Sequence, residues 1–263
     1  MTQTTEWTAS RVAGAAMQSK VPQVTAAFWI VKILATTAGE TGGDALSMTL
    51  NLGYAVATLI FLAFFIVTLA VQVRASRYHP LAYWAVVVAT TTVGTTTSDF
   101  LDRTVGLGYV KSSALLLTAV IVVLVIWRVV AGRIEYERIV SRRDEVFYWV
   151  AIVVSNTLGT ALGDFTASSA GLGFEGGALV FAGLLVIVAL VWRFGPRVPA
   201  AVLFWCAYVL TRPLGATLGD TLTKPLADGG LALGRFAATF TIIALMVVIV
   251  FAQSRRAARI RGR

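Results

Sequence analysis

Eight long apolar segments alternate with short polar ones along the chain. Each is close to the roughly 20 residues that a helix needs to cross a hydrocarbon core about 30 Å thick. The segments span approximately residues 22–43, 51–73, 80–101, 110–131, 146–165, 176–194, 198–221 and 231–252. Because a strand would leave backbone groups unpaired in lipid, helices are the elements that fit. The pattern predicts an all-α polytopic membrane protein with about eight transmembrane helices.

The odd-numbered segments share one motif. A glycine follows a tryptophan by ten residues, and an aspartate preceded by a small residue follows it by fifteen. The tryptophans and glycines are Trp29 and Gly39, Trp84 and Gly94, Trp149 and Gly159, and Trp205 and Gly215. The aspartates are Asp44, Asp99, Asp164 and Asp220. Four matches at fixed spacing indicate duplication of a two-helix unit. Parallel repeats of this kind predict a pseudo-fourfold bundle or a pair of pairs, with the motif helices around a common centre.

The repeat divides the chain. The predicted units are a tail 1–21, repeats 22–79, 80–145, 146–197 and 198–252, and a basic tail 253–263. The second repeat includes a charged linker at 132–145, which we expect to continue the preceding helix into the cytoplasm. In three repeats a glycine stands nine residues after the aspartate, whereas the matching Gly234 falls five residues later. The fourth repeat therefore departs from the pattern in its turn.

On the strength of these tryptophans, the chain resembles an uncharacterised bacterial family of membrane-anchored proteins. That family is defined by four tandem two-helix repeats, each of which carries a tryptophan. The resemblance extends over about residues 22–252 and rests on Trp29, Trp84, Trp149 and Trp205. It implies a bacterial inner-membrane protein, and it implies neither a reaction nor a cofactor.

Composition and charge agree with a membrane protein. The chain is 57% hydrophobic and 13% charged, whereas a soluble domain carries about 25% charged residues. Its net charge of +9 comes largely from basic clusters that follow the even-numbered segments and end at Arg263. Such clusters orient membrane proteins, so we expect both termini in the cytoplasm and no nucleic-acid partner. We expect Trp127 and Trp192, each followed by arginine, at the inner interface. The expected partners are the lipid bilayer and a small ion or molecule, and self-association stays open.

Recognisable enzyme motifs are missing from the sequence. It contains no helical HExxH, no GxSxG and no phosphate-binding loop. The single histidine, His79, lies in a basic loop, and the single cysteine, Cys206, lies in an apolar run where no disulfide partner exists. We therefore expect a protein that is not an enzyme.

Charged residues near or within the apolar segments are the candidate functional groups. Ionisable side chains in membrane helices usually mark a pathway or a partner. The acidic ones are Glu40, Asp44, Asp99, Asp102, Asp164 and Asp220, and the basic ones are Lys32, Arg103, Arg212 and Lys224. Arg212 stands mid-helix beside Pro213 and needs an acidic partner or a wet cavity. Glu40 is the natural candidate for the partner, with one of the aspartates next. If the repeats form a ring, their first and fourth copies meet, and we expect Lys32, Glu40, Asp44, Arg212, Asp220 and Lys224 at that seam.

Three functions fit these residues. The leading hypothesis is a transporter or channel-like protein for a small cation, in which the four motif aspartates form a binding site, a candidate metal site or a proton relay. The second is a small-anion transporter that uses Lys32 and Arg212. The third is a scaffold or sensor without transport, in which the charges only fix packing. Two simpler interpretations also stay open: the glycines only pack helices, and the aspartates are water-exposed residues at helix ends.

Overall fold

The structure is a computed structural model, and it describes residues 20–75, 78–134, 139, 141–195 and 198–261. The described residues form helices and contain no strand, as the sequence predicts. The motif helices are α2 (Ala26–Asp44), α4 (Pro80–Asp99), α6 (Arg142–Asp164) and α8 (Ala200–Thr223). The intervening helices are α3 (Gly53–Arg74), α5 (Gly108–Ala131), α7 (Gly173–Phe194) and α9 (Arg235–Arg261). Nearly all of the predicted tail 1–21 lies outside the described residues.

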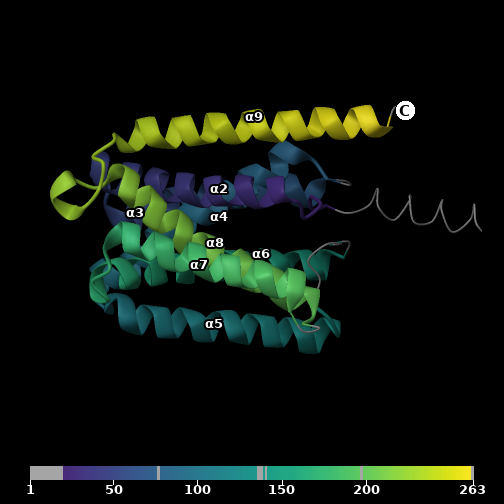
Figure 1. Ribbon diagram of the computed structural model, residues 1–263, viewed down its shortest axis with the longest axis horizontal. Helices are drawn as coiled ribbons and strands as arrows, with labels where there is room; N and C mark the ends of the chain where they lie inside the picture. The colour runs from purple at the N-terminus through teal and green to yellow at the C-terminus, as the bar shows by residue number, and fades with distance from the viewer. Residues whose placement is uncertain (1–19, 76–77, 135–138, 140, 196–197, 262–263) are drawn as a thin grey trace, which may run out of the picture.

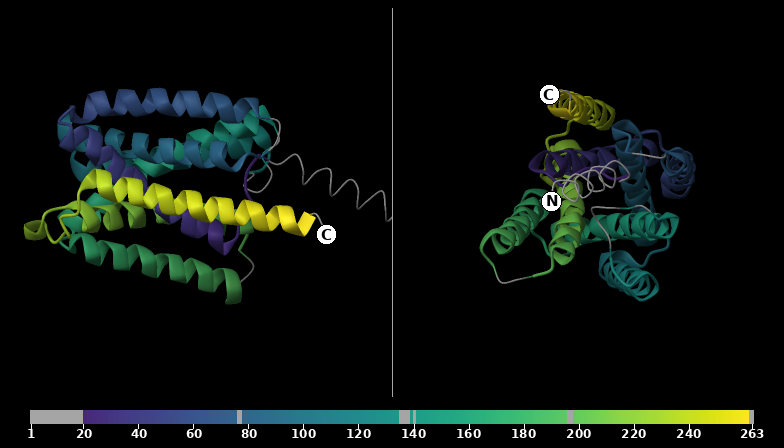
Figure 2. Two further views of the ribbon diagram at one scale, coloured as in Figure 1. Left: turned by 90° about the horizontal axis from the view of Figure 1, so that it is seen from above. Right: turned by 90° about the vertical axis from the view of Figure 1, so that its right-hand side faces the viewer.

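The four motif helices form a closed ring. Helix α2 packs against α4 and α8, and α6 packs against the same two helices from the other side. The end-on view in Figure 2 shows this inner ring with the other helices around it. Each outer helix covers the motif helix of the next repeat: α3 packs on α4, α5 on α6, α7 on α8, and α9 returns to α2 (Figure 1). The predicted ring of motif helices is therefore present, and the first and fourth repeats meet.

Local sequence explains where the inner helices begin. The side chains of Thr25, His79 and Ser141 each accept a hydrogen bond from a backbone N–H in the first turn of α2, α4 and α6. Such caps satisfy donors that a helix start leaves unpaired. Pro80 occupies the first position of α4, where its missing N–H costs nothing.

The turn between the two helices of a repeat explains why a glycine follows the motif aspartate by nine residues in three of the repeats. One π-helical turn follows each of the first three motif aspartates, at Ala45–Thr49, Phe100–Thr104 and Phe165–Ser169. The chain then enters the outer helix at Gly53, Gly108 and Gly173, whose φ angles are +74°, +71° and +67°. Glycine adopts such angles at little steric cost. In the fourth repeat a 3₁₀ turn (Leu226–Asp228) replaces the π turn, and positive φ angles fall on Gly229 and Ala232 rather than on Gly234.

Two sequence predictions are wrong at the other end of the helices, where one repeat connects to the next. Helix α5 ends at Ala131 because Gly132 adopts a φ of +76°, so the charged linker does not continue that helix. Trp127 is fully buried, stacks on Phe147 and donates from its indole N–H to Asp144 at 3.2 Å, so it does not face the interface. Trp192 is 71% exposed.

The surface of the helices identifies a multi-pass membrane protein. Six described helices, α3, α5, α6, α7, α8 and α9, are long and apolar enough to cross a membrane by length and composition. Large apolar side chains cover the outer helices. Among them are Leu59, Leu179 and Val248, which are 65–74% exposed. Exposed apolar surface of this extent marks contact with lipid or protein. Helices α2 and α4 are more polar, and the ring and the outer helices enclose them.

Candidate functional site: the axis of the inner ring

Aromatic side chains close one end of the ring. In every repeat the residue before the motif tryptophan packs against the tryptophan of the next repeat. The ring centroids are 5.6 Å apart for Phe28 and Trp84, 5.7 Å for Tyr83 and Trp149, 5.9 Å for Tyr148 and Trp205, and 5.7 Å for Phe204 and Trp29. The hydroxyl groups of Tyr83 and Tyr148 share a hydrogen bond of 2.7 Å. The motif tryptophans thus form one aromatic layer, which we call the aromatic plug.

The motif glycines let neighbouring helices approach closely. On each glycine lies the side chain that stands seven residues after the tryptophan of the next repeat. The pairs are Gly39 with Thr91, Gly94 with Asn156, Gly159 with Arg212, and Gly215 with Thr36. A methyl group added to any of these glycines would overlap the neighbouring side chain or backbone. The glycines therefore pack the ring, as small residues do in membrane helices.

A buried ion pair crosses the seam between the first and fourth repeats. The Nη2 atom of Arg212 lies 3.0 Å from Oε2 of Glu40, and both side chains are buried. Nη2 also donates to the hydroxyl of Thr95 on α4, and that hydroxyl donates to Oε2 of Glu40 at 3.3 Å. The side chain of Arg212 thus joins α8, α2 and α4. The partner predicted for Arg212 from the sequence is confirmed.

Lys32 lies in the same interior, and no carboxylate of the described residues pairs with it. Its side chain is fully buried, and its ammonium nitrogen lies 4.2 Å from the centroid of the Tyr208 ring. No described group accepts a hydrogen bond from this nitrogen, although the charge of Arg212 is within electrostatic range.

At the other end of the ring, two cations each bridge two motif aspartates. Lys224 Nζ lies 2.8 Å from Oδ2 of Asp44 and 3.1 Å from Oδ1 of Asp220. Arg103 Nε lies 3.2 Å from Oδ1 of Asp99, and its Nη2 lies 3.5 Å from Oδ2 of Asp164. Burial alone would lower the pKa of Lys224, but the carboxylates of Asp220 and Asp44 outweigh this effect and raise that pKa above its ordinary value. The carboxylates therefore form two bridged pairs.

The four motif aspartates share this end of the ring. Three of them end their helices, as the simpler interpretation expects, but each of the four is between 1% and 4% exposed, so the expected exposure to water is wrong. Lys224 joins the carboxylates of α2 and α8, and Arg103 joins those of α4 and α6. These side chains therefore converge from four helices.

The bridging cations leave no cluster of metal ligands. Within the described residues no group of three or more His, Cys, Asp or Glu side chains could hold a metal ion. The four aspartates, predicted as a candidate metal site, are held in pairs by Lys224 and Arg103 instead. Asp102 lies apart from these pairs and accepts a hydrogen bond from the hydroxyl of Ser98 at 3.2 Å.

Some residues at the axis were not singled out from the sequence. Arg235 Nε lies 3.5 Å from Oδ2 of Asp44, and Tyr54 accepts a hydrogen bond from Arg103 Nη1 at 2.9 Å. Both follow the repeat glycine directly, so alignment of that position would have found them. Tyr83 and Tyr148 precede the motif tryptophan, and the same alignment would have identified them.

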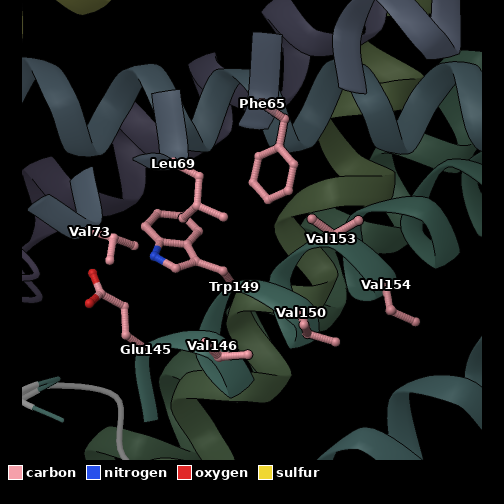
Figure 3. Close-up of a pocket in the computed structure, with 9 residues that line it drawn as sticks. All are labelled: Phe65, Leu69, Val73, Glu145, Val146, Trp149, Val150, Val153 and Val154. Atoms are coloured by element: carbon pink, nitrogen blue, oxygen red, sulfur yellow. The ribbon is translucent and has the colours of Figure 1, made fainter. Parts of the chain in front are cut away.

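An apolar groove on the outside of the ring is a separate feature. Figure 3 shows it between Phe65, Leu69 and Val73 of α3 and a face of α6 that includes Trp149 and Val150. Glu145 is the charged residue in its lining, and it pairs with Lys20 at 2.9 Å. The groove lies between α3 and α6 and its lining is apolar apart from Glu145, so it is separate from the charged axis.

Comparison with known proteins supports the repeat and supplies no activity. A family model described as a Repeat of Unknown Function (DUF347) matches the chain four times, at residues 27–78, 82–133, 147–197 and 203–259. Each motif tryptophan stands at the third position of its match. No match is found among curated proteins or among solved structures.

Proposed function

Since the chain belongs to the DUF347 family of repeats of unknown function, no activity carries over to it, and we propose one from the ring itself. The protein is a membrane transporter or channel-like protein for a small cation, and the cation is the proton. The observation that carries this proposal is the convergence of four buried aspartates from four helices at one end of a polar axis.

In this proposal all eight helices cross a bacterial inner membrane, and both termini lie in the cytoplasm. Helices α2 and α4 cross although they are polar, because α9 packs on the first and α3 on the second. The basic residues near the aromatic plug, such as Arg74 and Arg128, then face the cytoplasm, as the positive-inside rule favours. The aspartates lie toward the outer face.

Titratable side chains continue from the aspartates along the axis. Glu40 interacts electrostatically with Asp164 and Asp220 and is joined to Arg212. Beyond Arg212 lies Lys32, which contacts the ring of Tyr208. The Tyr208 ring packs against Trp205, and Trp205 contacts Tyr148, whose hydroxyl is bonded to that of Tyr83 in the aromatic plug. Chains of carboxylates and hydroxyls inside membranes are typical of proton relays.

The charges at the centre favour a proton over a metal ion. A metal cation on the axis would meet the positive charges of Arg212 and Lys32 with one carboxylate, that of Glu40, beside them. Repulsion between like charges is strong where the surroundings are poorly polarisable. A proton avoids this barrier, because it moves as a change of charge on groups already in place.

The experiment is proton flux into liposomes that contain the purified protein and a pH-sensitive dye, driven by a potassium diffusion potential. We expect uptake with the native chain and at least a tenfold loss, on the scale of about 10²–10⁴ typical for a proton-transfer group, in each of four variants. The variants are Asp44→Asn, Asp99→Asn, Asp164→Asn and Asp220→Asn. The matched control is Asp228→Asn, which changes an exposed aspartate in the turn of the fourth repeat.

The outcomes separate the competing functions. Native flux in all four variants would refute the proposal. A native protein that inserts and stays folded but carries no protons would favour a scaffold, in which the buried charges fix packing alone.

A further inference from the structure

The centre of the ring carries more positive than negative charge. Between the motif tryptophans and the aspartate pairs, the inner helices contain Lys32, Arg212 and Glu40 as their charged residues. Glu40 neutralises Arg212 at 3.0 Å, and Lys32 has no carboxylate. A buried charge without a partner is strongly unfavourable, so one positive charge at the centre needs either a counter-ion or the loss of its proton.

Hydrogen-bond donors are also in excess there. Glu40 and Thr95 use Nη2 of Arg212, which leaves its Nε and Nη1 without partners among the described residues. The Lys32 ammonium, the Tyr208 hydroxyl and the Trp205 indole nitrogen are likewise buried and unpaired. Buried donors are normally satisfied. Asn156 Oδ1 is an unpaired acceptor in the neighbouring repeat, but an amide oxygen carries no charge that could neutralise Lys32.

We propose that the centre of the ring binds one small monovalent anion, such as a halide, between the Lys32 ammonium and the free N–H groups of Arg212. The anion supplies the missing charge and accepts the unpaired hydrogen bonds. Glu40 and Thr95 bond to Arg212, and its side chain packs on Gly159. Its unpaired N–H groups are therefore fixed in place before the anion binds. Preorganised donors of this kind favour tight binding.

This inference rests on the proposed function and adds an anion to the proton path, because an anion beside Lys32 favours the protonated amine. Proton uptake at Lys32 and anion binding would then support each other by linkage. The test below measures binding without transport, so a failure of the anion site and a failure of proton flux are separate results.

The experiment compares sodium chloride, bromide and iodide with sodium gluconate at constant ionic strength, on the purified full chain in detergent. We expect the thermal midpoint to rise with halide concentration, by a constant increment per tenfold increase once the dissociation constant is exceeded. Binding of radioactive iodide, measured by scintillation proximity, should saturate at one ion per chain.

Two variants test whether the halide binds at the centre of the ring. Lys32→Met removes a charge that has no carboxylate partner, so it should fold, lose at least tenfold in iodide affinity and lose the halide-dependent rise. Lys111→Met, at an exposed lysine of α5, should keep both. The proposal is overturned if the native chain shows no difference between halide and gluconate, or if Lys32→Met binds iodide as the native chain does.

Discussion

Two sets of layers along the axis follow different symmetries. In the aromatic plug and in the glycine contacts, each repeat touches the next by the same rule around the whole ring. The charged layers break that rule. Lys224 of the fourth repeat bridges Asp220 and Asp44, and Arg103 of the second bridges Asp99 and Asp164. Met48 and Ser168 occupy the equivalent position in the first and third repeats. The Glu40–Arg212 pair occurs at one seam.

The difference separates the framework from the chemistry. Backbone contacts through glycine fix the spacing of four similar helices, and a substitution at one equivalent position then places a new group on the axis without a change of fold. Arg212 stands where two other repeats have Thr36 and Thr91, and Glu40 stands where two have Thr95 and Thr160. The proposed proton path therefore combines four aspartates that every repeat carries with Arg212 and Glu40, which occur in one repeat each.

The largest effect is expected from breaking the asymmetric pair. Glu40→Thr leaves the Arg212 guanidinium buried without a carboxylate, and Arg212→Thr leaves Glu40 buried without a cation. Either change should lower the free energy of unfolding by about 3–5 kcal/mol. The double variant gives both positions the residue found in other repeats, and it should lose less than either single one. Chemical unfolding in detergent measures all three, and additive losses in the double variant would contradict a coupled pair.

A smaller effect is expected from the symmetric layer. Gly39→Ala places a methyl group against Thr91, and overpacking of this kind costs about 1–3 kcal/mol. Gly183→Ala on outer helix α7, where no atom lies within 4 Å of the added carbon, is the control and should be neutral or stabilising. Thermal midpoints of the two variants check the contrast. Equal midpoints would show that the close approach at Gly39 does not limit packing.

Much of this arrangement followed from the sequence. The spacing of Trp29, Gly39 and Asp44 and its three copies predicts the ring, because duplicated helices of one length bring equivalent positions to one level. The Arg212–Glu40 pair followed from the position of a charged arginine in the middle of an apolar helix, which calls for an acidic partner. The turn of the fourth repeat did not follow, because the backbone angle at Gly234 depends on the loop around it. The contacts of Lys224 with Asp44 and Asp220 lie at the seam where the sequence predicts them. The bridge from Arg103 to Asp99 and Asp164 was missed, because the reach of its side chain across another seam sets its partners.

The smallest effect is expected where the aromatic plug itself departs from fourfold symmetry. Tyr83 and Tyr148 stand at positions that Phe28 and Phe204 occupy in the other repeats, and their hydroxyls bond to each other at 2.7 Å. Tyr83→Phe or Tyr148→Phe leaves one buried hydroxyl unpaired and should lower the free energy of unfolding by about 1 kcal/mol, whereas removal of both hydroxyls is nearly neutral. If the hydroxyl pair also relays protons, the double variant keeps its thermal midpoint but loses flux in liposomes. Unchanged flux in that variant would confine the relay to the carboxylate half of the axis and leave the tyrosines as packing residues.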